Sequence, residues 1–554
     1  MFIVKKRING KEYYYARTSK REKGKIKSIT IAYLGKTKEE AEKNFQKILK
    51  EFNEKNKMEE IEKENKIKLT IEELASFCKR KSFIFKSSEI YGGLSGFWDY
   101  GPLGAELFNN LKKDFLKFFL YNRDDMVFIE ASIISHPKTW YASGHVSNFQ
   151  DFAAVCKKCK KAIKLDKSEI NNKKCDCGGN YELLGNFNLM FKTNVGALNP
   201  IETYLRPETA QGMFLNFKNI YETSRVKLPF GILQIGKCFR NEISPRDFIF
   251  RSREFTIGEF EFFINPNENK CNLLDEEHLN LRLKLLDKET QEAGKEEIRE
   301  VTIKEMIKEK RLEEWHAYWL AEQIMWFNKL NLIDNIRVRE HKKDELSHYS
   351  SATFDIDYEF PFGILEIAGI ANRGQYDLTQ HEKESKEKLS IYDEKTKLKI
   401  IPKVIEPTFG MDRIFLAIIC KGYEYDEKRE NIVLKIPSYL APIKAAIFPI
   451  VKNENYEKLA KEIYKELKKE FNVFYDDSAS IGRRYARQDE IGTPYCVTVD
   501  EESITKKDCT IRDRDTTQQI RVDIKDLKNT LKKLIEKEIK FEDAGKIVNT
   551  RKKI

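Results

Sequence analysis

The 554-residue sequence predicts a multidomain α+β protein, since a chain of this length is too long for one core. Two apolar runs, 231–239 and 253–263, are joined by a loop at 241–251 and predict a hairpin of an antiparallel sheet. From residue 445 onward, strand-like and helix-like segments alternate, which is typical of a compact α/β domain. We expect a large antiparallel-sheet domain, a C-terminal α/β domain and a small β-rich module at the N-terminus.

The N-terminal module, residues 1–60, is predicted from short β-like runs at 2–4, 13–17 and 28–34. Asn9-Gly10 is a strong hairpin-turn signal, and Thr37 is placed to cap a helix that runs towards Phe52. A Lys/Glu-rich helix or linker, 51–68, follows the module.

The positive charge of the chain is concentrated in this module. Residues 1–38 contain twelve Lys and Arg against Glu12 and Glu22, an excess of ten out of a net charge of +11. Such an asymmetry indicates a polyanionic partner, most simply nucleic acid. A solvated charged surface is the alternative, and it fits the glutamate-balanced lysines elsewhere better than it fits this block.

The central hairpin combines an apolar face with an acidic one. Side chains alternate along a strand, so Glu259 and Glu261 share one face while Phe260 and Phe262 take the other. Arginine forks onto phosphate oxygens, so arginines beside an acidic floor suit a nucleotide and a cationic substrate. A surface hairpin with ordinary ion pairs would show the same residues.

Several longer segments of the sequence resemble motifs of the class II aminoacyl-tRNA synthetases. Phe239-Arg240-Asn241-Glu242 resembles their motif 2, and Gly410-Met411-Asp412-Arg413 resembles motif 3. The segments 88–94, 99–104, 204–212, 239–246, 369–373 and 404–407 narrow the resemblance to the glycyl-tRNA synthetases of the single-chain, homodimeric type. The match runs from about Thr70 into the C-terminal region.

The resemblance implies a domain plan. The catalytic domain would span 70–436, with a zinc-ribbon insertion at about 152–185 and a helical insertion at about 268–335. Residues 438–554 would form an anticodon-binding α/β domain, because 481–494 resembles the one shared by the glycine, proline, threonine and histidine enzymes. Motif 1, around 101–104, would lie at the interface of a homodimer.

The resemblance also implies a two-step reaction. The glycine carboxylate attacks the α-phosphate of ATP, and the glycyl group then passes to the 3′-terminal ribose of tRNA(Gly). Positioning and charge stabilisation would do most of the work, with Mg²⁺ as cofactor. The implied catalytic residues are Arg240 and Arg413.

Each implied ATP contact falls on a matched motif position. Arg240 would hold the α-phosphate, Glu242 the adenine amino group, and Arg251 with Arg413 the outer phosphates. Phe255 would stack on adenine, and Glu366 would bind magnesium or the nucleotide. The implied ATP site is completed by Asn241, Phe250 and Ile367.

Glycine offers only its ammonium and carboxylate for recognition. Glu208, Glu259 and Glu406 match the family's acidic ammonium site, and Thr408 stands where the family usually has serine. Arg206, two residues before Glu208, is expected to neutralise or order it. Larger amino acids are excluded by volume and nothing smaller competes, so no editing domain is required.

Four of the ten cysteines cluster, as Cys156-x-x-Cys159 and Cys175-x-Cys177. Two close pairs predict tetrahedral thiolate ligation of a structural zinc ion, with four free thiols as the alternative. The family more often spaces the second pair as Cys-x-x-Cys. Residues 1–7 lack a signal-peptide core and no apolar run approaches about twenty residues, so we expect a cytoplasmic protein with no membrane partner.

Two other functions remain open at this point. A catalytically silent paralogue could use the basic module and the zinc ribbon to bind nucleic acid, but it would have no need of Arg240, Glu242 and Arg413 together. The same enzyme class could act on proline or threonine. The glycine-type contexts of Glu208 and Glu406 argue against that reading.

Overall fold

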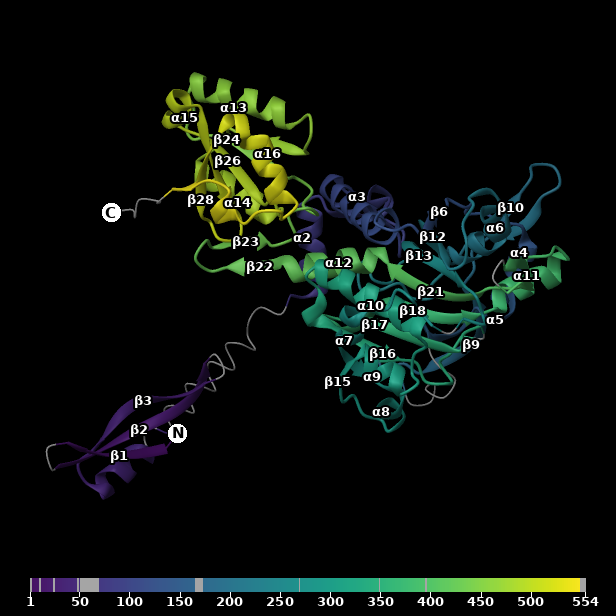
Figure 1. Cartoon of the computed structure of the whole chain (residues 1–554), viewed down its shortest axis with the longest axis horizontal. Helices are drawn as coiled ribbons and strands as arrows, with labels where there is room; N and C mark the ends of the chain where they lie inside the picture. Colours follow the sequence, from purple (N-terminus) through teal and green to yellow (C-terminus); the bar gives the residue numbers. More distant parts are fainter. Residues whose placement is uncertain are drawn as a thin grey trace. The chain divides into compact units, whose positions relative to one another are not determined.

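The structure is a computed structural model that describes residues 2–8, 11–22, 25–46, 49, 69–164, 173–268, 270–347, 349–393 and 396–548 (Figure 1). The chain divides into two compact units, Met1–Thr70 and Ile71–Ile554. Within the described residues, no helix combines the length and the apolar character needed to cross a membrane.

The N-terminal unit is a three-stranded antiparallel sheet with a helix. Its strands are β1 (Phe2–Ile8), β2 (Lys11–Glu22) and β3 (Lys25–Gly35), in the order β1-β2-β3. Residues 38–46 are helical, and the Thr37 hydroxyl accepts a hydrogen bond from the Glu40 amide at 3.3 Å, which confirms the predicted cap. Ala16, Leu34 and Ala41 form the small core between sheet and helix. The predicted turn at Asn9-Gly10 and the predicted linker at 51–68 lie outside the described residues.

A nine-stranded sheet forms the centre of the second unit (Figure 1). The strand order is β15-β14-β16-β17-β18-β21-β13-β12-β6, antiparallel except for the pairs β14/β16 and β12/β6. The strands are β6 (Met126–Phe128), β12 (Phe230–Phe239), β13 (Glu254–Ile264), β14 (Arg282–Leu286), β15 (Arg299–Thr302), β16 (Ile336–Glu340), β17 (Ala352–Phe360), β18 (Gly363–Gly374) and β21 (Lys403–Gly410). The predicted hairpin is β12-β13, which confirms the antiparallel sheet.

Aromatic side chains fill one face of this sheet. Phe260 and Phe262 of β13 meet Trp319 of α10 (Glu314–Lys329), with ring centroids 4.7 and 4.8 Å apart. Phe409 of β21 packs against Phe115 of α3 (Pro102–Leu116) at 5.0 Å. α12 (Met411–Gly422) follows β21 directly and is also largely buried. The alternating polar residues of the same strands therefore lie on the opposite face.

The segment at 268–335, expected to be helical, also contributes two strands. β14 and β15 extend the large sheet at its edge, between the short helices α7 (Glu276–Asn280), α8 (Lys288–Glu292) and α9 (Ile303–Lys308). In β14, Leu283 and Leu285 are buried while Arg282 and Lys284 are exposed, which is the period of a half-buried strand. The aromatic residues of the segment, Trp315, Tyr318, Trp319, Trp326 and Phe327, lie in α10 and are buried.

Smaller elements surround the sheet. The cysteine-bearing region is a sheet in the order β8-β7-β9, formed by β7 (Gln150–Cys156), β8 (Ala162–Lys164) and β9 (Tyr181–Asn188). The other elements are α2 (Ile71–Arg80), β4 (Ile84–Lys86), β5 (Trp98–Tyr100), α4 (Pro137–Ala142), α5 (His145–Asn148), β10 (Lys192–Val195), β11 (Ile201–Tyr204), α6 (Ala210–Thr223), α11 (Tyr376–Ser385), β19 (Ile391–Asp393), β20 (Leu398–Ile400), β22 (Tyr423–Asp426) and β23 (Asn431–Leu434).

The C-terminal part is the predicted α/β arrangement. Its sheet has the order β25-β24-β26-β27-β28-β29, with β24 parallel to both β25 and β26 and antiparallel pairing from β26 to β29. The strands are β24 (Ala445–Pro449), β25 (Val473–Tyr475), β26 (Tyr495–Val499), β27 (Asp508–Asp513), β28 (Gln519–Asp523) and β29 (Lys546–Ile547), and the helices are α13 (Glu454–Leu467), α14 (Ile481–Glu490), α15 (Glu501–Lys506) and α16 (Ile524–Ile535). The boundary near 437 stays a prediction.

Candidate active site

A pocket of about 650 Å³ opens where β12, β13, β18 and β21 meet the start of α12. Seven of the nine residues predicted to bind ATP line it: Arg240, Glu242, Phe250, Arg251, Phe255, Glu366 and Arg413. Thr408, predicted to contact glycine, also lies in its wall. Arg240 and Arg413, which are 173 residues apart in sequence, therefore belong to one site.

The arginines of this pocket rest on aromatic rings. The Arg240 guanidinium lies 5.3 Å from the ring centroids of both Phe149 and Phe255, and its Nε donates to the Pro207 carbonyl at 3.2 Å. The Arg413 guanidinium lies 4.5 Å from the centroid of the Phe250 ring. Cation–π contacts of this kind orient a guanidinium, and its five N–H donors leave capacity for a further anion.

Two carboxylates of the pocket each pair with an arginine. Glu242 accepts from Arg251 Nε at 2.8 Å, and Glu366 Oε2 lies 3.1 Å from Arg413 Nη1. The wall of the pocket thus contains both arginines and carboxylates.

Asn241 and Ile367 do not line the pocket. The backbone amide of Asn241 donates to the Leu189 carbonyl at 2.7 Å, and the Ile367 side chain is buried in the core. Ile367 lies between Glu366 and Ala368, which do line the pocket, at a register shift of the β17/β18 pair that leaves it without a partner on β17.

A buried aspartate, not predicted as a site residue, anchors motif 3. Asp412 accepts from the Tyr100 hydroxyl at 2.5 Å and from the Thr256 amide at 2.5 Å. Burial, and next the Asp412 charge, raise the pKa of Tyr100 well above its ordinary value. These hydrogen bonds connect α12 to β13, and they therefore fix the backbone position of the neighbouring Arg413.

Four buried glutamates form an acidic cluster on the sheet face opposite the aromatic core: Glu208, Glu259, Glu261 and Glu406. One carboxyl oxygen from each of Glu259, Glu261 and Glu406 lies within 4.8 Å of the others. Three of the four were predicted to bind the glycine ammonium, and Glu261 joins them because it shares the face of Glu259.

Arg373 is the cation at the centre of this cluster. It is 1 % exposed, and its Nη1 donates to Glu406 at 2.6 Å. Its Nε and Nη2 both donate to Asp377 at 2.8 Å, and Nη2 lies 3.8 Å from Glu208. The guanidinium is stacked 3.8 Å from the Tyr349 ring centroid. One side chain on β18 thus links carboxylates from a loop, from α11 and from β21.

Glu208 is held by polar neighbours on its other side. His145 Nε2 lies 3.2 Å from one carboxylate oxygen, and Gln211 donates to the other at 2.9 Å. Burial by itself would raise the pKa of Glu208, but His145, Arg373 and Gln211 outweigh it and hold that pKa well below the usual range.

Glu259 connects the acidic cluster with the nucleotide pocket. It accepts from the Thr209 hydroxyl at 2.5 Å and amide at 3.1 Å, and from the Thr408 hydroxyl at 2.9 Å. Thr408 lines the pocket at the same time. A small molecule that bridges the two regions would pass Thr408.

Arg206 does not order Glu208, contrary to expectation. Its Nε donates to the Lys237 carbonyl at 2.7 Å and its Nη1 to the Ala131 carbonyl at 2.8 Å. Glu208 is instead contacted by Gln211 at 2.9 Å, His145 at 3.2 Å and Arg373 at 3.8 Å, and Arg373, in the matched segment 369–373, had no predicted part. Its contacts with the carboxylates could not be predicted from the sequence, because two of them, those of Glu208 and Glu406, are distant from it in the chain.

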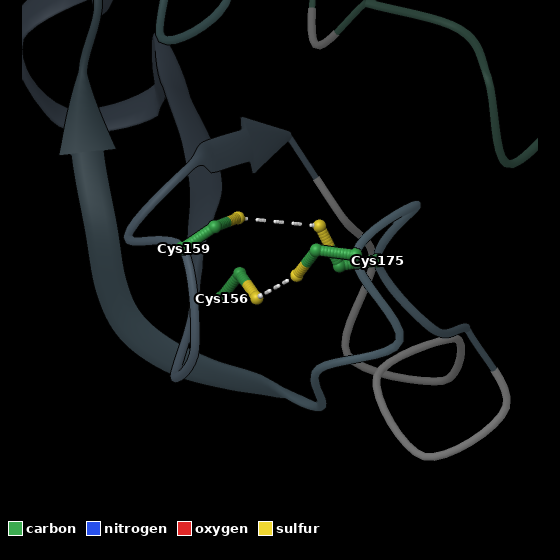
Figure 2. Close-up of side chains that lie close together, drawn as sticks. Cys156, Cys159 and Cys175 are labelled. Carbon is green, nitrogen blue, oxygen red and sulfur yellow. Dashed lines mark hydrogen bonds between the residues drawn. The ribbon is translucent and has the colours of Figure 1, made fainter.

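The four clustered cysteines converge as predicted. Their sulfur atoms all lie within 4.8 Å of one another, with Cys156 and Cys177 3.4 Å apart and Cys159 and Cys175 3.5 Å apart. Figure 2 shows the labelled side chains of Cys156, Cys159 and Cys175 pointing toward a common centre. A Cβ on Gly179 would lie 2.6 Å from Cys156 Sγ, so this position requires glycine.

A second, basic cavity of about 1110 Å³ lies between the cysteine-bearing sheet and the motif 2 loop. It shares Glu242 and Arg251 with the nucleotide pocket. Its wall includes the cations Lys161, Lys164, Lys173, Lys174, Arg246 and Arg251. The chemistry of this wall suits a phosphate-bearing ligand.

Comparisons with known proteins agree with this geometry. A family model described as "tRNA synthetase class II core domain (G, H, P, S and T)" matches residues 191–421, and one described as "Anticodon binding domain" matches residues 444–534. The solved structure of a prolyl-tRNA synthetase from Cryptosporidium parvum, complexed with L-proline and AMP, shares the fold. Its TM-score is 0.51 at 16% identity, covering 84% of this chain and 77% of that one. The chain thus has a class II synthetase core followed by an anticodon-binding domain.

Relatives at higher identity narrow the class. The glycine–tRNA ligase of Borreliella burgdorferi is 43% identical over 473 residues, which cover 83% of this chain and 97% of that protein. The glycine–tRNA ligase of Caldanaerobacter subterraneus is 42% identical over 508 residues, which cover 86% of this chain and 100% of that protein. This chain belongs to the glycine–tRNA ligase family, as the sequence motifs predicted.

Glu261 gives the acidic cluster a testable pH dependence. It is 0 % exposed, and neither carboxyl oxygen has a hydrogen-bond partner among the described residues. Burial, and next the charge of Glu406, raise the pKa of Glu261 well above its ordinary value. The folded protein therefore keeps this proton at pH values where the unfolded chain, with a pKa of about 4.3, has lost it.

We predict that Glu261→Gln, which is neutral at every pH, gains in stability relative to the parent as pH rises from about 5 to 8. Each pH unit in which only the unfolded chain ionises costs the parent up to about 1.4 kcal/mol. Melting temperatures of both proteins across this range measure the difference, with Glu359→Gln, at an exposed position of β17, as control. A difference that does not change with pH would show that Glu261 is ionised in the folded protein.

Proposed function

We propose that this chain activates glycine with ATP to form glycyl-adenylate and transfers the glycyl group to the 3′-terminal ribose of tRNA(Gly). The observation that carries the proposal is the direct contact between two regions of opposite chemistry. A buried acidic cluster and an arginine-lined pocket meet at Thr408, whose hydroxyl donates to Glu259 at 2.9 Å. An amino acid bound there presents its ammonium to the acids and its carboxylate to the nucleotide.

The acidic cluster has the charge to bind an ammonium group. The carboxyl groups of Glu208, Glu259, Glu261, Asp377 and Glu406 face Arg373 and His145. Burial raises the pKa of Glu406 as it does that of Glu261, and even with both neutral the three remaining carboxylates, Glu208, Glu259 and Asp377, outnumber Arg373 and His145. A buried excess of negative charge is costly unless a cation compensates it, and the ammonium of glycine supplies one.

The arginines of the pocket are positioned to stabilise a reacting phosphate. Arg240 rests on Phe149 and Phe255, and Arg413 rests on Phe250. Side chains fixed before the substrate binds need no reorganisation when charge develops on the α-phosphate, which is the main source of catalysis in this type of site. Phe255 presents an aromatic ring on which adenine could stack.

Magnesium would be held at Glu366. Its carboxylate is about half exposed and faces the pocket beside Arg413, and Mg²⁺ prefers such oxygen ligands together with substrate phosphates. When bound, the ion would neutralise charge on the outer phosphates.

The tRNA would contact two regions of the second unit. The segment matched by the anticodon-binding model supports binding of the anticodon end. The basic cavity shares Arg251 with the nucleotide pocket, so it supports an approach of the phosphates at the acceptor end.

We also propose that the protein is a homodimer and acts in the cytoplasm. The motif 1 region at the start of α3 would lie in the dimer interface. Light scattering at micromolar concentration measures the oligomeric state.

The four cysteines would hold one structural zinc ion. In a tetrahedral site with Zn–S bonds of about 2.3 Å, neighbouring sulfur atoms lie about 3.8 Å apart. The separations of 3.4 and 3.5 Å, with all four sulfurs within 4.8 Å, fit that geometry in spite of the Cys-x-Cys spacing. The backbone amides of Cys159 and, to a smaller extent, Lys158 lower the pKa of Cys156, which favours the thiolate that zinc requires, whereas the neighbouring thiols raise the pKa of Cys159 to about 12.

The first test of the function is Arg240→Ala. We expect glycine-dependent exchange of pyrophosphate into ATP to fall by about a hundredfold or more, because a preorganised charge contact to the transition state is lost. Arg246→Ala is the matched control, since Arg246 lies in the same loop but outside the nucleotide pocket. Near-normal pyrophosphate exchange by Arg240→Ala would contradict the proposed contact of Arg240 with the α-phosphate.

The zinc proposal predicts one zinc ion per chain in protein purified under reducing conditions. Elemental analysis should find it in the parent and in Cys420→Ser, and should find it lost or greatly reduced in Cys175→Ser, because one of four ligands is removed. A metal-free parent protein would favour four free thiols.

A further inference from the structure

The N-terminal sheet has one covered face and one open face. Ile3, Tyr14 and Ala16 point to the helix at 38–46, where they pack with Leu34 and Ala41. Neighbouring residues along each strand point the other way. No element of the described part of this unit packs on that second face as the helix does on the first.

The open face carries a cluster of aromatic rings. Tyr13 and Tyr15 of β2 lie beside Tyr33 of β3, with ring centroids 6.3 and 5.4 Å from that of Tyr33. Tyr33 is 48 % exposed although it belongs to a strand. Three contacting tyrosines on an exposed sheet face have apolar surface that the module does not bury by itself.

Cations border these rings. The Lys6 ammonium lies 5.5 Å from the centroid of the Tyr15 ring, and Arg17 follows Tyr15 on the same side of β2. On the covered side, by contrast, Lys5 is paired with Glu12 at 2.6 Å. The first 38 residues as a whole have an excess of ten positive charges.

We propose that this open face, defined by Lys6, Tyr13, Tyr15, Arg17 and Tyr33, binds the tRNA substrate. Aromatic rings on a sheet stack on unpaired bases, and the bordering cations contact phosphates. A protein partner of acidic character would match the charge, but in a nucleic acid every phosphate is accompanied by a planar base that can stack on the exposed rings. The identity of the RNA rests on the proposed function, whereas the chemistry of the face does not.

The linkage to the ligase gives the face a role. The module is covalently joined to the unit that carries the synthetase core, so its binding site and the active site share one chain. A second site on the same RNA then acts at a high effective concentration. The face would raise the affinity for tRNA without contact with the amino acid or with ATP.

The test compares full-length variants at exposed positions. Lys6→Glu combined with Tyr33→Ala alters the open face, and Lys43→Glu makes the same charge change on the exposed side of the helix. Binding of a tRNA(Gly) transcript is measured by fluorescence anisotropy over a range of salt concentrations. A 24-base-pair duplex DNA is the second probe, and glycine-dependent pyrophosphate exchange is measured in parallel because it needs no tRNA.

We expect the double variant to bind the transcript about tenfold more weakly at low salt, with the salt slope reduced by about one for the lost Lys6 contact. Lys43→Glu should keep the parent affinity, and exchange should be unchanged throughout. Unchanged affinity and slope in the double variant would overturn the inference, as would a loss of binding confined to the duplex. Failure of the parent in the exchange assay would refute the proposed function instead, and would leave the binding comparison to be judged by itself.

Discussion

The site depends on the burial of one guanidinium among carboxylates. Arg373 is almost inaccessible to solvent, donates to Glu406 and Asp377, and stands next to Glu208. A buried arginine without partners would be severely destabilising, and so would any one of these acids. Each group therefore fixes the others, and the loop before α6, the start of α11 and the strand β21 are held in one arrangement.

The two faces of the large sheet divide the work. On one face, the rings of Phe260, Phe262 and Phe409 are packed by α10 and α3, which makes the strands rigid. On the other face, the same strands present Glu259, Glu261 and Glu406 at fixed spacing. Strand alternation thus connects the hydrophobic core to the electrostatics of the site, and precise positioning of charge is what this reaction requires.

The predictable parts of the molecule are those governed by local patterns. The apolar runs 231–239 and 253–263 predicted β12 and β13, and side-chain alternation along the second predicted the common face of Glu259 and Glu261. The strand–helix alternation after 445 predicted the C-terminal sheet. The edge strands β14 and β15 were missed because alternation over only four or five residues does not outweigh the helical pattern of the segments around them. The sequence motifs placed seven of the nine predicted ATP-binding residues at the pocket, but Ile367, at a register shift of the β17/β18 pair, is buried in the core.

The parts that were not predictable depend on long-range contacts. Arg206 lies two residues from Glu208 and was the natural partner by sequence, yet its donors reach backbone carbonyls. Glu208 contacts Gln211, only three residues on, but the basic side chains that face it, His145 and Arg373, are 63 and 165 residues away in sequence. Likewise the anchor of motif 3 by Tyr100 joins positions 312 residues apart. No local pattern encodes such pairs, which are fixed by the fold as a whole.

The central claim is that Arg373 organises the carboxylates that read the ammonium of glycine. The most direct test is Arg373→Lys, which keeps the charge and removes the forked geometry. The KM for glycine in pyrophosphate exchange should rise roughly tenfold or more, since 1.4 kcal/mol of lost binding is tenfold, while the KM for ATP changes little. A folded Arg373→Lys protein with the parent KM for glycine would contradict the account.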